Sequence, residues 1–141
     1  MKLKLKLLMI ELFMENNILL NSDNKFLRIE LLHSDAYFTF YITIKSEKFS
    51  GGADFSVFES DISCFIKALS TMHNKLVGSC TLKDINSDSY IKLEMIKLGK
   101  MLVYGKIEDS FERFIMKFEI ESDQSVLPNL INIFERALLT K

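Results

Sequence analysis

The stretch AYFTFYITIK, residues 36–45, alternates apolar and polar side chains with a period of two. One side of an extended chain here would carry Phe38, Phe40, Ile42 and Ile44. The other side would carry Tyr37, Thr39, Tyr41 and Thr43. This pattern predicts a strand with one buried face and one face in water.

The residues on both sides of this strand continue the pattern. A strand is predicted at 25–32 and another at 48–58, each rich in residues that favour strands. Gly51 and Gly52 interrupt the second of them. Because glycine accepts positive φ at no steric cost, this pair predicts a bulge or a sharp bend.

Two segments have the period of a helix instead. In residues 61–76, apolar side chains recur every three or four residues, and Ser60 or Asp61 is expected to cap the start. A second amphipathic helix closes the chain, with its apolar stripe formed by Leu127, Leu130, Ile131, Phe134, Ala137 and Leu138. Pro128 falls in its first turn, where the missing N–H costs nothing.

Strand patterns resume between the helices at 77–83, 90–96, 101–108 and 111–121, with short turn-forming connections. Short connections join antiparallel neighbours. We therefore predict an α+β fold with a single antiparallel β-sheet (meander) and two amphipathic helices packed on one face, as a single domain over residues 1–141. The predicted core is Phe38, Phe40, Phe65, Ile66, Leu93, Phe118, Leu130 and Phe134.

Residues 1–14 admit three interpretations. Lysines beside the apolar run 7–10 are similar to a signal peptide, but Glu11 interrupts the run and no small-residue cleavage site follows. Alternation of Lys and Leu over residues 2–7 favours an edge strand. Alternatively, Met14 is the natural start and the residues before it are a translated leader.

Charge and hydropathy exclude some classes of partner. Eighteen basic and nineteen acidic residues give a net charge of −1, which provides no electrostatic basis for binding nucleic acid directly. No apolar run approaches the roughly 20 residues that span a bilayer, so we expect a soluble, cytoplasmic protein that does not enter a membrane. Cys64 and Cys80 are expected to be reduced, buried thiols.

The sequence provides little for catalysis. His33 and His73 are the only histidines, and neither lies near a nucleophile or a paired carboxylate in the sequence. Metal-binding spacings and phosphate-binding glycine loops are absent from it. We therefore predict no catalytic residues, no metal, no cofactor and no enzyme activity.

A candidate binding surface comes from the polar sides of the predicted strands. All four tyrosines fall there, and the candidate residues are Tyr37, Tyr41, Tyr90, Lys92, Glu94 and Tyr104. Tyrosine is enriched at the energetic centres of protein interfaces, although aromatic residues also simply favour strands. An acidic edge formed by Glu108, Asp109 and Glu112 is the second candidate.

Several short segments carry a resemblance that extends from Phe49 to the C-terminus. They are FSGGAD at 49–54, a glycine at 78 just after the first predicted helix, Gly99 and Gly105 in the meander, and the signature from Phe118 through Glu121 to Asp123-Gln124-Ser125 and Leu127. In their order and spacing they resemble the WapI-type family of bacterial immunity proteins. The family signature more often reads Asp-Gln-Thr, so Ser125 departs from it but keeps the hydroxyl.

The resemblance implies a cytoplasmic protein that binds the toxic C-terminal domain of a cognate polymorphic toxin, as in contact-dependent growth inhibition. Such toxins are often nucleases, including tRNases. Asp123 and Gln124 are expected to be structural, with Asp123 bonded to backbone N–H groups at the start of the last helix.

Two other interpretations stay open at this point: an intracellular protein-binding adaptor without catalysis, and an unrecognised enzyme. Inhibition by surface complementarity can use many surfaces. The sequence therefore predicts neither the activity of the toxin nor an oligomeric state.

Overall fold

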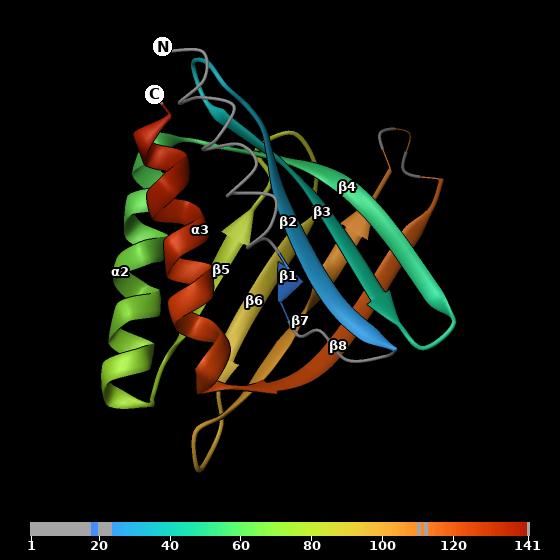
Figure 1. Cartoon of the computed structure of the whole chain (residues 1–141). Helices are drawn as coiled ribbons and strands as arrows, with labels where there is room; N and C mark the ends of the chain where they lie inside the picture. The colour runs from blue at the N-terminus through green and yellow to red at the C-terminus, as the bar shows by residue number, and fades with distance from the viewer. Residues whose placement is uncertain (1–17, 20–23, 110, 112, 141) are drawn as a thin grey trace.

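The computed structural model describes residues 18–19, 24–109, 111 and 113–140 (Figure 1). Its first sheet has the order β1 (Ile18–Leu19), β2 (Lys25–Ser34), β3 (Phe38–Ser46) and β4 (Phe49–Val57). Neighbouring strands are antiparallel throughout. The strands predicted at 25–32, 36–45 and 48–58 are confirmed, with ends that differ by no more than two residues.

The second sheet is an antiparallel meander of β5 (Ser79–Lys83), β6 (Tyr90–Met95), β7 (Lys100–Glu108) and β8 (Ile115–Asp123). All four strands were predicted, although β8 begins four residues later than the predicted strand 111–121. Phe111, Arg113 and Phe114 lie outside the strand, and Asp109 N–H donates to the Phe114 carbonyl at 3.1 Å.

The predicted α+β class and antiparallel pairing are confirmed, but the single sheet is wrong. Among the described residues, no strand pairing joins β4 to β5, and the chain passes from one to the other through α2 (Glu59–Lys75). Turn signals predict pairing inside each meander, whereas pairing across a helix is not local in sequence.

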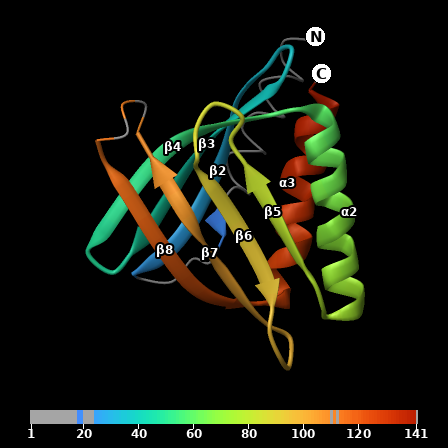
Figure 2. The same ribbon diagram turned by 180° about the vertical axis from the view of Figure 1, so that it is seen from behind.

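The two helices lie side by side on one side of the molecule, α2 beside β5 and α3 (Leu127–Leu139) near β2 (Figures 1 and 2). Their apolar stripes point into the space where the two sheets meet. One small cavity there is lined by residues of both sheets and both helices, including Leu27, Leu93, Phe65 and Phe134. The two helices therefore lie on the same side of the molecule, as predicted. They cover the opening between two sheets and not the face of a single sheet.

One continuous core joins the inner faces of the sheets to the helices. Phe134 is at its centre, with its ring 5.2 Å from that of Phe40 and 5.1 Å from that of Phe65, both in edge-to-face geometry. All predicted core residues are buried except Ile66, which is partly buried against the core. Burial of such aromatic rings is a main source of stability.

The start of α2 differs from the prediction. Phe58 is at the N-cap position, and neither Ser60 nor Asp61 occupies it. Asp61 lies at the third helical position, where its carboxylate accepts a hydrogen bond from the Phe58 N–H at 3.1 Å. The acidic side chain thus satisfies a terminal N–H group from inside the helix.

The start of α3 confirms the predicted role of Asp123. A short 3-10 helix, η1 (Gln124–Val126), leads into α3, and Asp123 caps it by accepting a hydrogen bond from Ser125 N–H at 2.8 Å. Gln124 N–H donates to the Gly99 carbonyl at 2.9 Å, so the same segment is tied to the β6–β7 turn. Pro128 lies in the first turn of α3, as predicted.

The glycine pair of β4 forms no bulge, which corrects the prediction. Pairing of β3 with β4 runs without a register shift from Ser46 and Phe49 to Phe38 and Val57, and the irregularity of this sheet lies between β2 and β3. The space beside both glycines is instead occupied by neighbouring side chains. A Cβ on Gly52 would overlap the Tyr41 hydroxyl, and a Cβ on Gly51 would lie 3.2 Å from Ile107 Cδ1 and Met116 Sδ.

A buried polar network ties the two sheets together beyond the end of β5. The Asp84 carboxylate accepts hydrogen bonds from Ser56 N–H of β4 at 2.9 Å and from the Ser87 hydroxyl at 2.6 Å. Glu108 N–H of β7 donates to the Ser89 hydroxyl at 3.0 Å. Because buried polar groups need partners, this network fixes the loop between β5 and β6 against both sheets.

Neither helix in the described part of the chain is long and apolar enough to cross a membrane. The prediction for residues 1–14, a leader or an edge strand, lies outside the described residues.

Candidate protein-binding surface

The two-sheet architecture divides the tyrosines between two surfaces. Tyr90 of β6 and Tyr104 of β7 lie on the outer face of the second sheet. Tyr41 of β3 lies on the outer face of the first sheet, and Tyr37 comes just before that strand. Since the inner faces of the sheets meet in one core, the two outer faces point away from each other. The expectation that all four tyrosines share one face is therefore wrong.

Tyr90, Lys92, Glu94 and Tyr104 form what we call the tyrosine face. Lys92 is directly opposite Tyr104 in the ladder, and its Nζ lies 5.9 Å from the centroid of the Tyr104 ring. The Tyr104 hydroxyl donates a hydrogen bond to Glu94 Oε2 at 2.9 Å. The Tyr104 ring is thereby held in one orientation between a cation and a carboxylate. A side chain that is already ordered loses less conformational entropy when a partner binds.

Strand register arranges the charges around Tyr104 by sign. At one end of the face, the cross-strand row is Lys83, Tyr90, Lys106 and Lys117. At the other end it is Ser79, Glu94, Leu102 and Glu121. The row at Tyr90 is therefore mainly basic, with Lys106 paired to Glu108 Oε2 at 3.9 Å, and the row at Glu94 is mainly acidic, with Tyr104 between them. This polarity suits a protein partner whose charges run in the opposite order.

The acidic edge predicted at Glu108, Asp109 and Glu112 is not one surface. Glu108 is 8% exposed, and its carboxylate accepts a hydrogen bond from Asp88 N–H at 2.8 Å. Asp109 accepts hydrogen bonds from the N–H groups of Phe114 and Arg113, and these bonds hold the pKa of Asp109 below its usual value. Both carboxylates thus have structural partners, and Glu112 lies outside the described residues.

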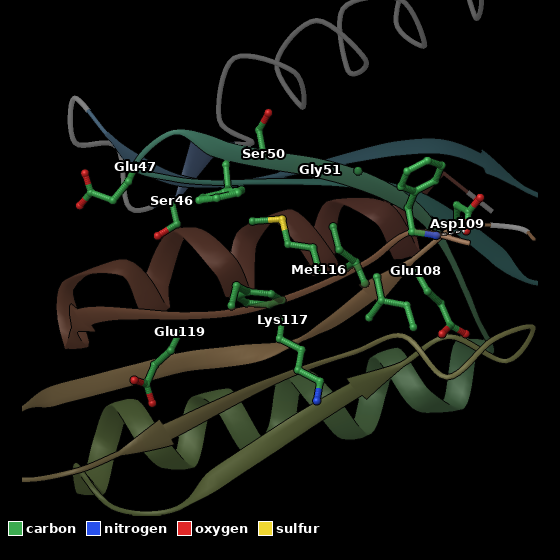
Figure 3. Close-up of a pocket in the computed structure, with 15 residues that line it drawn as sticks. Ser46, Glu47, Ser50, Gly51, Glu108, Asp109, Met116, Lys117 and Glu119 are labelled. Atoms are coloured by element: carbon green, nitrogen blue, oxygen red, sulfur yellow. Dashed lines mark hydrogen bonds between the residues drawn. The ribbon is translucent and has the colours of Figure 1, made fainter. Parts of the chain in front are cut away.

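A cleft of about 740 Å³ lies between β4 and β8 (Figure 3). Figures 1 and 2 show the β3–β4 turn and the start of β8 on the side of the molecule opposite the helices. Ile107, Met116 and Phe118 line its apolar part, and residues 49–52 of β4 form the opposite wall. Large apolar side chains stand exposed at its rim, with Phe49 at 75%, Phe114 at 73% and Ile115 at 55%. Exposed apolar surface of this kind marks binding sites.

The cleft could not be read from the sequence, because its walls come from segments about sixty positions apart. One signal was available. Phe111 and Phe114 fall in a turn rather than in the predicted strand, and both are more than 70% exposed. A turn that carries two exposed phenylalanines is unusual, because apolar side chains are normally buried.

The groups considered for catalysis lie apart from the cleft. His33 and Asp35 approach within 3.6 Å, but both are well exposed, and neither they nor His73 line the cleft. Burial raises the pKa of the Cys80 thiol to about 12, so this thiol is protonated at neutral pH and a poor nucleophile. Cys80 is buried as predicted, whereas Cys64 is exposed. In the described part of the chain, no three His, Cys, Asp or Glu residues gather as metal ligands would.

The comparison with known proteins gives one match. The model of the immunity protein WapI-like family matches residues 18–140. No curated protein and no solved structure matches the chain. The match covers both sheets and both helices, including the Asp123-Gln124-Ser125 segment that caps η1. The chain belongs to the WapI-like family of immunity proteins.

Proposed function

We propose that this protein binds the toxic C-terminal domain of a cognate bacterial polymorphic toxin and neutralises it. The observation that carries the proposal is the family match over residues 18–140. Binding alone accounts for neutralisation, since a tightly bound protein can block an active site without chemistry of its own. We place this action in the cytoplasm of the producing cell, in competition between bacteria, and include nucleases among the toxins it neutralises.

The tyrosine face is our proposal for the centre of the interface. An oriented aromatic ring surrounded by charges of both signs matches the anatomy of protein interfaces, in which aromatic anchors are enclosed by a polar rim. Tyr104 supports this best, because Glu94 and Lys92 already hold it in place. Tyr37 and Tyr41 belong to the opposite surface and are proposed as partner contacts only if the partner also reaches the first sheet.

A growth assay tests the function directly. The toxin domain encoded by the neighbouring gene is expressed in cells with this protein, or with a variant in which Tyr90 and Tyr104 are both alanine. The wild-type protein should restore growth, and the variant should protect less at equal abundance. Growth arrest despite abundant wild-type protein would contradict the proposed function, whereas full protection by the variant would move the interface elsewhere.

A further inference from the structure

Two edge strands face each other across the cleft. β4 is paired only with β3, and β8 only with β7, among the described residues. Residues 49–52 of β4 and 115–119 of β8 form opposite walls of the cleft (Figure 3). An edge strand presents a row of backbone N–H and C=O groups that can pair with another chain.

The orientation of the β4 backbone follows from its bonds near the end of the strand. Ser56 N–H donates to Asp84 Oδ1, and the Ser56 carbonyl accepts from Ile85 N–H at 3.0 Å, so both backbone groups of Ser56 point away from β3. Backbone direction alternates along an antiparallel strand. The N–H and C=O groups of Asp54, Gly52 and Ser50 therefore also point away from β3, and they have no partner among the described residues.

The β8 edge is open in the same way but differs in its side chains. The hydrogen bond from Gln124 N–H to the Gly99 carbonyl shows that the backbone groups of Gln124 point towards β7. Because this direction alternates along β8, the backbone groups of Ile115, Lys117 and Glu119 point away from β7. Charged side chains on an edge strand discourage pairing with other chains. On β4 the corresponding residues Ser50 and Gly52 are small and uncharged and only Asp54 is charged, so the stretch of β4 up to Gly52 is the more receptive edge.

The cleft in front of β4 has the chemistry to receive side chains. Its inner part is apolar, and its rim carries carboxylates at Glu47, Asp109 and Glu119 and an ammonium at Lys117, whereas Glu108 is buried and paired with Lys106. A segment that fills it would place apolar residues inward and basic residues at the rim. The volume of about 740 Å³ is within the range of sites that bind ligands in proteins.

We propose that the cleft receives an extended segment of the toxin domain, which pairs as a strand with β4 at Ser50, Gly52 and Asp54, along the edge that no other described strand occupies. The inference rests on the proposed function and names the element of the partner that is recognised. The tyrosine face and the cleft adjoin each other, because Glu119 of β8 lines the cleft and is paired with Tyr104 in the ladder. One partner can thus cover the tyrosine face and enter the cleft around β8.

The matched variants Ser50→Pro and Ser50→Ala separate backbone pairing from side-chain contact. Proline removes an outward N–H and is tolerated on an edge strand, whereas alanine keeps that N–H. Calorimetry with the purified toxin domain should show a Kd about tenfold weaker for the proline variant and unchanged for the alanine variant. Equal melting temperatures would show that both variants fold.

A second pair tests the cleft itself. Phe49→Asp at the rim should weaken toxin binding, whereas Leu98→Asp, at a side chain 95% exposed in the β6–β7 turn, should not. Amide hydrogen exchange adds a direct readout. The amides of Gly52 and Asp54 should exchange rapidly in the free protein and become protected in the complex. The amide of Phe55, already paired with β3, is the internal control.

The outcomes separate the two proposals. If the toxin binds tightly while Ser50→Pro has no effect and Gly52 and Asp54 stay unprotected, the strand inference is wrong and the proposed function stands. If the wild-type protein does not bind the toxin domain, both are wrong. Protection of these amides in the protein alone, with a dimer in light scattering, would assign the edge to a second copy of this chain and also overturn the inference.

Discussion

The helix-covered side and the cleft side of the molecule use the same residue type for different purposes. Beside the helices, Phe40, Phe65 and Phe134 stack edge to face, and none of them is more than 5% exposed. Beside the cleft, Phe49 and Phe114 are each more than 70% exposed. Burial of phenylalanine stabilises the fold on one side, and exposure provides apolar surface for a partner on the other.

The difference indicates that stability and recognition are separated in space. The helices close one opening between the two sheets, and nothing in the described part of the chain closes the other, between β4 and β8. Substitutions on the helix side should therefore change the free energy of unfolding. Substitutions on the tyrosine face and at the cleft should instead change the affinity for the toxin.

The largest effect is expected for Phe134→Ala. Removing a fully buried ring with two aromatic partners leaves a cavity and should cost about 3–5 kcal/mol, a large part of the stability of a typical domain. Urea denaturation measures this cost. Phe134→Leu is the control if the alanine variant does not fold, and a cost below about 1 kcal/mol for alanine would show that the helix side is not the stable side.

The next effect is on affinity and concerns Tyr104. Tyr104→Ala should weaken toxin binding by about 2 kcal/mol and leave the melting temperature nearly unchanged. Tyr104→Phe, which keeps the ring and loses the hydrogen bond to Glu94, should have a smaller effect. Tyr90→Ala is expected to resemble Tyr104→Ala. Surface plasmon resonance gives the affinities, and unchanged affinity for both alanine variants would remove the tyrosine face from the interface.

A smaller effect on stability is expected for Asp123→Ala. This change removes the cap of η1, and with it the acceptor for Ser125 N–H. The melting temperature should fall by about 2–6 °C while toxin affinity stays the same. Asp123→Asn, which can still accept the hydrogen bond, should lose less. A loss of affinity without a loss of stability would instead make this segment a contact site.

The smallest effect is a pH dependence of the same cap. Hydrogen bonds from the Ser125 hydroxyl and then from its backbone N–H hold the pKa of Asp123 below the ordinary carboxyl value. A lowered folded-state pKa stabilises the fold at pH above the ordinary value, and the stabilisation is lost as pH falls through the folded pKa. The difference in melting temperature between wild type and Asp123→Ala should shrink from about pH 6 to about pH 3. A constant difference would contradict this.

Local patterns predicted the elements of the fold well. The alternation over 36–45 identifies β3 and its buried face, and the helical periods identify α2 and α3. The Asp123 cap was also predicted, because capping depends on residues close in sequence. Outward placement of Tyr90 and Tyr104 follows from the same alternation.

Properties that depend on distant segments were missed. The split into two sheets depends on whether β4 pairs with β5 across α2, which no local pattern encodes. The role of Gly51 and Gly52 was misjudged because Tyr41, Ile107 and Met116, which occupy the space of their missing side chains, lie elsewhere in the sequence. Glu108 was placed on the surface because its buried bond to Asp88 is equally non-local.

Hydrogen exchange over the whole chain, with and without the toxin domain, tests the separation of stability and recognition most directly. We predict new protection in β4, in β8 and on the strands of the tyrosine face, β6 and β7, with unchanged exchange in α2 and α3. New protection confined to the outer surfaces of α2 and α3, with β4 and β8 unchanged, would place the toxin on the stable side and contradict this account.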